Sequence, residues 1–97
     1  DELFDIDLNR AAAGADDLIL KKIGSHDDLP QSIQEVLVEM VFQLGATGVK
    51  QFRNMWASLK EKDGEMAAMH MKDSRWHKQT KNRCESLAKI VASAKWT

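Results

Sequence analysis

The apolar residues of this chain recur with the period of an α-helix, and this feature most limits the folds open to it. The strongest repeat spans residues 33–44, where apolar side chains follow one another at intervals of three and four. Val38 and Phe42 add apolar surface outside that stripe. A helix that is apolar on nearly all sides is normally buried by its neighbours. We therefore predict a central core helix that begins near Pro30 and ends at Gly45.

Helical periodicity continues on both sides of this segment. An earlier stripe predicts a long helix over about residues 2–22, which Gly24 ends by adopting a left-handed conformation. Later stripes predict three more helices, over about residues 49–60, 65–71 and 82–95. A brief capped turn containing Trp76 precedes the last of them, for which Asn82 is the candidate N-cap and Ile90 is one of the inward residues.

No stretch alternates apolar and polar residues with the period of a strand, so we expect no sheet. The prediction is an all-α domain of five to six helices around the central buried one. A length of 97 residues suits a single domain, residues 1–97. No apolar run approaches the ~20 residues that span a bilayer, so we expect no membrane span. The first residues also lack the basic and apolar segments of a secretory signal.

The charges are divided unevenly along the chain. Residues 1–48 carry ten acidic and three basic side chains, a net charge of −7, whereas residues 49–97 carry five and eleven, a net charge of +6. A basic half favours a polyanionic partner such as nucleic acid or an anionic wall polymer. The alternative is that the two halves neutralise each other across the fold.

Few side chains are spaced for catalysis or metal binding. The histidines His26, His70 and His77 lack the short spacing of a zinc site, so we expect no metal and no cofactor. The carboxylates of Glu35 and Glu39 share a helical face and could act as a catalytic pair, or they form a solvated strip. Nothing nearby in sequence would separate their pKa values, which favours the strip.

The single cysteine, Cys84, excludes an internal disulfide framework and a thiolate zinc site. A cysteine near the start of a helix can have a lowered pKa. No histidine lies close to Cys84 in the sequence, so we interpret it as a small buried apolar residue.

Two stretches carry more information than periodicity does. Residues 40–48 read Met-Val-Phe-Gln-Leu-Gly-Ala-Thr-Gly and are followed by Phe52. Residues 73–83 read Asp-Ser-Arg-Trp-His-Lys-Gln-Thr-Lys-Asn-Arg. In residue identity, order and spacing, both stretches closely resemble the phage-type lysozymes, the muramidases of tailed phages. The opening residues 2–4 with Asp7 resemble the start of the long helix that joins the two lobes of that family.

The resemblance implies a particular division of the chain. Residues 1–24 match the connecting helix, and residues 30–97 match the lysozyme-like helical lobe. The family's smaller lobe, which supplies a catalytic glutamate followed by an aspartate and a threonine, has no counterpart in this sequence. The resemblance therefore assigns no catalytic residue to this chain.

The resemblance also implies roles for single residues. It places three on the cleft wall, at the end of the central helix: Phe42, Gln43 and Leu44. It places His70 and Arg75 facing the glycan or its peptide stem. It matches Arg83 to the arginine that pairs with the catalytic glutamate of the other lobe, where a guanidinium would favour the ionised carboxylate.

Three functions remain as hypotheses. The resemblance favours the substrate-binding helical lobe of a muramidase, which cleaves the β-1,4 bond between N-acetylmuramic acid and N-acetylglucosamine in an endolysin or a tail lysozyme. The alternative is a non-catalytic lysozyme-like module that is structural or binds peptidoglycan. The third is a helical interaction domain that binds a partner through a helix groove.

The expected partners follow from the first two hypotheses. They are peptidoglycan and either the missing N-terminal lobe or another phage protein chain. We expect no nucleic-acid partner, because no nucleic-acid-binding motif accompanies the basic residues. Such a protein would reside in the host cytoplasm before lysis or in the virion tail, and would act at the cell wall.

Overall fold

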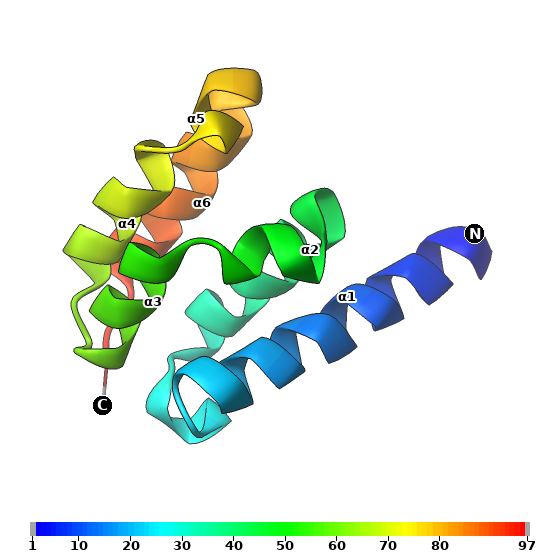
Figure 1. Ribbon diagram of the computed structural model, residues 1–97, viewed down its shortest axis with the longest axis horizontal. Helices are drawn as coiled ribbons and strands as arrows, with labels where there is room; N and C mark the ends of the chain where they lie inside the picture. Colours follow the sequence, from blue (N-terminus) through cyan, green and yellow to red (C-terminus); the bar gives the residue numbers. More distant parts are fainter. Residues whose placement is uncertain (1, 97) are drawn as a thin grey trace.

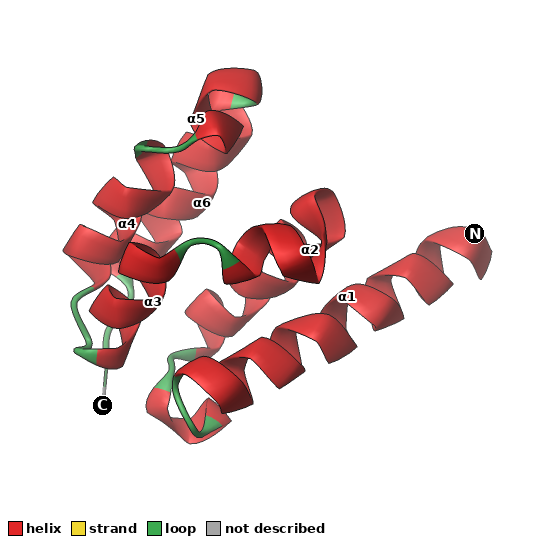
Figure 2. Cartoon of the chain, in the orientation of Figure 1, coloured by secondary structure: helices red, strands yellow, loops and turns green. Residues whose placement is uncertain are grey.

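Six α-helices and one short 3-10 helix build the part of the chain that the computed structural model describes. The backbone is described for residues 2–96, and the side chains for residues 9–25 and 27–96. In chain order the elements are α1 (Glu2–Lys22), η1 (His26–Asp28), α2 (Gln31–Lys50), α3 (Arg53–Lys60), α4 (Gly64–Lys72), α5 (Arg75–Gln79) and α6 (Lys81–Ser93). Helices and short loops are the only structures in these residues (Figure 2), so the all-α prediction is confirmed.

The long helix α1 lies along one side of the molecule and packs against α2 (Figure 1). Its bounds agree with those predicted from the sequence. The helix ends because Gly24 adopts a left-handed conformation, with φ of 107°. This turn lets the N–H groups of Ile23 and Gly24 donate to the carbonyl oxygen of Ile19 at 2.8 and 3.0 Å, which satisfies a helix-end acceptor.

Helix α2 is the central helix, with α1 on one side and α6 contacting it on another. Its core face is fully buried and consists of Ile33, Val36, Leu37 and Met40, with Val41 at 7% exposure. The expectation of a helix that is apolar and buried on all sides was wrong at Phe42, which is 42% exposed.

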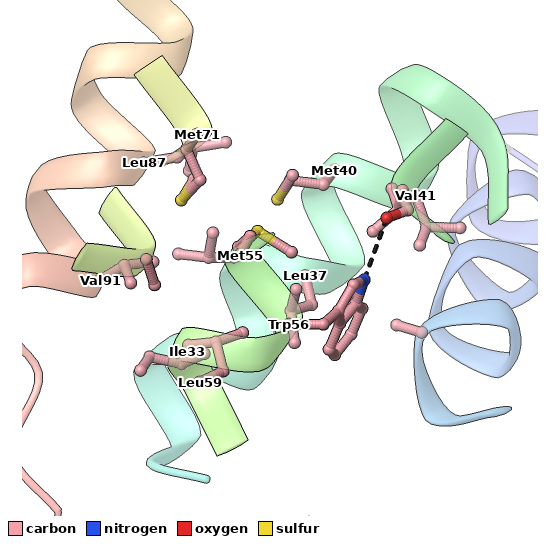
Figure 3. Close-up of a cluster of buried hydrophobic side chains, with 14 of the residues drawn as sticks. Ile33, Leu37, Met40, Val41, Met55, Trp56, Leu59, Met71, Leu87 and Val91 are labelled. Atoms are coloured by element: carbon pink, nitrogen blue, oxygen red, sulfur yellow. Dashed lines mark hydrogen bonds between the residues drawn. The ribbon is translucent and has the colours of Figure 1, made fainter. Parts of the chain in front are cut away.

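The prediction that the first helical segment of α2 ends at Gly45 is confirmed, but the sequence did not predict the short helical segment that follows it. Gly45 does leave the helical conformation, with φ of 78° and ψ of 158°, but the chain kinks and resumes a helical course to Lys50. Val49, in this second part, is fully buried. The indole Nε1 of Trp56 on α3 donates to the Val49 carbonyl oxygen at 3.0 Å (Figure 3), which holds the kinked segment against the core. Packing therefore continues the helix beyond a residue that locally favours stopping it.

The core extends from α2 into the second half of the chain. One buried cluster combines Met40 of α2, Met55 of α3, Met71 of α4 and Leu87 of α6 (Figure 3). Methionine suits such a junction, because its unbranched side chain adapts to irregular gaps between helices.

Three expectations for the last helix need correction. The residue before its first turn is Thr80 rather than Asn82, and the helix ends at Ser93. Ile90, expected to face inward, is 43% exposed because the packed face of α6 runs through Cys84, Leu87 and Val91. Among the described helices, none combines the length and apolar content needed to cross a membrane.

Candidate functional site

One pocket formed by the described residues has a volume of about 570 Å³. It lies where the kinked end of α2, the start of α3, the end of α4 and the short helix α5 meet. The lining residues are Leu44, Gly48, Gln51, Phe52, Arg53, Asn54, Met55, His70, Asp73, Ser74, Arg75, Trp76 and Gln79. Three of the residues singled out in the sequence, Leu44, His70 and Arg75, are therefore brought to one site.

Aromatic rings form the apolar part of this pocket. Trp76 is only 4% exposed, and its ring meets that of Phe52 edge to face, with centroids 6.3 Å apart. The Trp76 Nε1 donates to the side-chain oxygen of Gln43 at 3.3 Å. Gln43 is exposed and holds the indole of this pocket through that hydrogen bond, without being one of the lining residues.

The three adjacent residues expected on one wall point to different places. Leu44 lines the main pocket, Gln43 contacts Trp76, and Phe42 lines a separate cavity of about 360 Å³. That second cavity lies against α1, where Arg10 and Ala11 contribute to its lining. The difference follows from helix geometry, because successive side chains on a helix diverge by about 100°.

A serine cap positions the start of α5. The Ser74 hydroxyl accepts from the backbone N–H of His77 at 3.3 Å and donates to the carbonyl oxygen of Met71 at 2.6 Å. It therefore ties the first turn of α5 to the last turn of α4. This double contact directs Arg75 and Trp76 toward the pocket, and the capped turn that the sequence predicted around Trp76 is confirmed, with Ser74 as its cap.

Arg83 lies outside the pocket, at the start of α6. Its guanidinium is 3.5 Å from a carboxylate oxygen of Glu39, and both side chains are about half exposed. Glu39 and Gln43 are one helical turn apart on α2, so Arg83 and Trp76 contact the same face of that helix. Glu39 is thereby committed to an ion pair, and the Glu35 side chain is exposed.

Two other candidate side chains, His77 and Cys84, contact residues of neighbouring helices, and the side chain of His26 lies outside the described residues. His77 Nε2 lies 3.4 Å from a carboxylate oxygen of Glu85 without a hydrogen bond to any described residue. The Cys84 thiol is fully buried and contacts the carbonyl oxygen of Met71 at 3.4 Å. Burial, followed by the nearby Glu85 carboxylate, raises the Cys84 pKa from 9.0 to about 11, which disfavours a nucleophilic thiolate.

Sequence reasoning missed several lining residues, of which Arg53 is the most polar. Arg53 is the first residue of α3, and nothing in the helical periodicity distinguishes it from other surface cations. Its position relative to α5 depends on the turn at residues 51–52, which the sequence had placed inside a continuous helix. Among residues 9–25 and 27–96, no three His, Cys, Asp or Glu side chains are grouped to hold a metal ion.

The structure therefore defines an all-helical protein whose pocket combines aromatic and cationic side chains. No protein-family model matches the chain. Its sequence is, however, similar to those of phage peptidoglycan hydrolases and T4-type lysozymes, which confirms the resemblance to phage-type lysozymes.

Three relatives illustrate the similarity. The chain is 31% identical over 65 residues to a probable T4-type lysozyme 2 of Dictyostelium discoideum, a match covering 67% of the chain and 38% of the relative. It is 36% identical over 61 residues to the pre-baseplate central spike protein Gp5 of Enterobacteria phage T4, covering 63% of the chain and 11% of Gp5. It is 34% identical over 56 residues to the peptidoglycan hydrolase gp36 of Pseudomonas phage phiKMV, covering 58% of the chain and 6% of gp36. The chain thus spans well under half the length of each.

Proposed function

We propose that this chain forms the substrate-binding helical lobe of a phage-type muramidase. In this proposal residues 1–24 form the helix that leads to a second lobe, and residues 30–97 form one wall of the cleft that holds peptidoglycan. The carboxylates that cleave the β-1,4 glycosidic bond are supplied by a segment outside these 97 residues.

The observation that carries the proposal is the pocket that gathers Leu44, His70 and Arg75. These residues come from three separate helices, and they converge on a floor made by Phe52 and Trp76. An apolar surface bordered by a few polar groups is the usual form of a small-molecule site. The similarity to several lysozymes and peptidoglycan hydrolases makes a glycan the ligand to test first.

The carboxylates of α2 are poorly arranged for catalysis within this chain. Glycoside hydrolysis needs two carboxyl groups that flank the scissile bond, on opposite sides of the sugar. Glu35 and Glu39 instead project from the same face of one helix, and Glu39 is paired with Arg83. This arrangement supports a binding role for the lobe, with the acid and base lying elsewhere.

Arg83 is the residue that we propose contacts the catalytic glutamate of the second lobe. Its present ion pair with Glu39 is solvent-exposed, and exposed pairs contribute about 0–1 kcal/mol. Arg83 can therefore leave Glu39 and pair with another carboxylate at little cost in free energy. A guanidinium beside the catalytic acid would favour its ionised form, so the complete protein must offset that effect by burying the acid.

The test is binding and turnover by the purified chain. We expect it to bind insoluble peptidoglycan and a neutral chitin tetrasaccharide without cleaving either. His70→Ala and Arg75→Gln should each weaken binding by up to about tenfold, whereas the control Lys60→Gln, on the exposed end of α3, should not. Absence of binding would contradict the lobe assignment, and release of sugar fragments would contradict the external location of the acid and base.

The second candidate is a non-catalytic module of a larger phage or bacterial protein, either structural or peptidoglycan-binding. The similarity to a baseplate spike protein supports this second candidate. The coding sequence upstream of Asp1 discriminates between the two. A glutamate, aspartate and threonine motif of the lysozyme type supports the muramidase, and a different upstream domain supports the module.

A further inference from the structure

We propose that His77 and Glu85 form a pH-dependent latch, which holds helix α5 against α6 in acidic solution and loosens as the pH rises. The helix that it holds carries Arg75 and Trp76, two residues that line the pocket of about 570 Å³. The latch therefore sets how firmly one wall of that pocket is fixed. The proposal depends on contacts within this chain, and it holds whether or not the pocket binds a glycan.

Helix α5 needs contacts with its neighbours to stay in place. It contains five residues, too few for a helix to be stable by itself. Ser74 ties its first turn to α4, and the indole of Trp76 anchors it toward α2 through the hydrogen bond to Gln43 at 3.3 Å. An ionisable contact between His77 and Glu85 links it to α6, beside which it lies (Figure 1). A change in that contact therefore acts directly on the position of α5.

The His77 ring is held in an unfavourable arrangement while it is neutral. Its Nε2 atom is buried, lies 3.4 Å from a carboxylate oxygen of Glu85 and has no hydrogen-bond partner among the described residues. A buried polar atom without a partner costs free energy. When the neutral ring carries its proton on Nδ1, the Nε2 lone pair also faces the carboxylate oxygen, and two acceptors repel each other.

Protonation of the ring removes this conflict. Both nitrogens of an imidazolium are donors, so Nε2 then directs a donor and a positive charge at the Glu85 carboxylate. The Glu85 side chain is 46% exposed, which leaves it room to rotate into hydrogen-bonding geometry. The His77 side chain keeps 22% of its surface exposed, so water still solvates part of the charged ring. Protonated His77 therefore gains an ion pair that the neutral ring lacks.

The other titratable groups around His77 act on it more weakly. The charged side chains at the neighbouring ends of α4, α5 and α6 are Lys72, Asp73, Lys78, Lys81, Arg83 and Glu85. All are exposed, so solvent and salt screen those that do not contact the ring, and of the two carboxylates Glu85 is the one within ion-pair distance of Nε2. The buried Cys84 thiol stays neutral near pH 7, because burial and then Glu85 raise its pKa to about 11.

The direction of the pH effect follows from these charges. Histidine changes its charge between about pH 5 and 8, whereas carboxylates are generally ionised above about pH 5. The ion pair exists when α5 is docked and is lost when α5 is released, so docking favours the protonated ring. The contribution of the latch is therefore present in full on the acidic side of this range and is lost as the pH rises through it.

Amide hydrogen exchange of the full 97-residue chain tests the latch. The reporter is the Thr80 N–H, which donates to the Trp76 carbonyl oxygen at 2.9 Å and exchanges when α5 opens. At about pH 5.5, its protection in the parent should exceed that in Glu85→Gln by about two- to fivefold, the range that a partly exposed ion pair gives. At about pH 7.5 this excess should disappear, because the ring is then mostly neutral. Comparing variants at the same pH cancels the intrinsic pH dependence of exchange.

Two further variants identify the titrating group. His77→Gln removes the ring itself and should lose the same protection as Glu85→Gln, at the acidic pH only. His70→Gln removes a different histidine, on α4, and should match the parent in Thr80 protection at both pH values. Glu85 is exposed, so Glu85→Gln keeps the test valid even if His77→Gln fails to fold.

The outcomes are distinct. An excess of protection that appears only at the acidic pH, and that both His77→Gln and Glu85→Gln lose, supports the latch. No excess at the acidic pH, or an equal excess at both, overturns it. A loss in His70→Gln as large as that in Glu85→Gln also overturns it, because the titrating group is then not His77. The measurement needs no ligand, so its result is independent of the proposed glycan binding.

Discussion

Replacing Gly64 by alanine should destabilise the domain by forcing α4 away from α6. Gly64 is the first residue of α4 and is buried. A Cβ atom built on it would lie 2.4 Å from the backbone carbonyl oxygen of Val91 and 3.1 Å from the ring of Trp96. The carbonyl belongs to the backbone of α6, so it cannot move aside as a side chain would. The two helices must separate, and the substitution disturbs one of the main packing contacts of the fold.

The magnitude follows from two opposing effects. Adding a methyl group to a well-packed site costs about 1–3 kcal/mol. Alanine regains at most about 1 kcal/mol of helix propensity over glycine, and less at the first position of a helix. We therefore expect a net loss of about 1–2 kcal/mol in the free energy of unfolding. For a domain of this size the melting temperature should fall by about 5–15 °C.

Urea unfolding followed by circular dichroism measures this loss, and Gly14→Ala is the matched control. A Cβ at Gly14, inside α1, would lie 3.2 Å from a Val41 methyl and 3.5 Å from the Ala46 Cβ, so it meets side chains rather than backbone. There the gain in helix propensity and the crowding nearly cancel, and we expect a change within about 0.5 kcal/mol. If Gly64→Ala is as stable as the parent, the reasoning from the α4–α6 contact is refuted.

Three further predictions concern a cap, a thiol and an ion pair. Ser74→Ala should cost about 1 kcal/mol in urea unfolding through loss of the α5 cap, and an unchanged midpoint would contradict that role. Because the folded pKa of Cys84 is raised, the contribution of this thiol to stability should be fully present below about pH 9 and be lost as pH rises toward 11, since the unfolded thiol ionises first. Cys84→Ala should reduce the decline of stability over this range, and an identical slope would exclude the thiol as its source. Glu39→Gln should change stability by less than about 1 kcal/mol because its pair with Arg83 is exposed, and a larger loss would show that the pair is structurally important.

The helices were largely predictable because their signals are local. The bounds of α1 and the central position of α2 follow from the spacing of apolar residues and from the glycines that punctuate them. Gly45 marks the limit of this approach. Its backbone conformation is the expected one, yet the helix resumes beyond it because Val49 is buried and hydrogen-bonded to Trp56, a contact between two helices.

The candidate site was only partly predictable for the same reason. Leu44, His70 and Arg75 were singled out through a family resemblance, and the structure brings them to one pocket. Arg53 carried no signal, because its place in the pocket depends on how α3 packs relative to α5, two helices whose first residues are more than twenty positions apart in the chain. Phe42 was assigned to the same wall, yet it lines a different cavity.

The sequence by itself determined that this chain is helical, that α2 lies at its centre and that its motifs are those of lysozyme-like proteins. Periodicity and turn residues act over a few positions, so they are legible without a structure. Tertiary structure alone decided which apolar side chains stay exposed, whether α2 resumes a helical course after Gly45, and which cations share a pocket. Those outcomes depend on how complementary helix surfaces pack across the whole chain, and a local pattern contains no record of that packing.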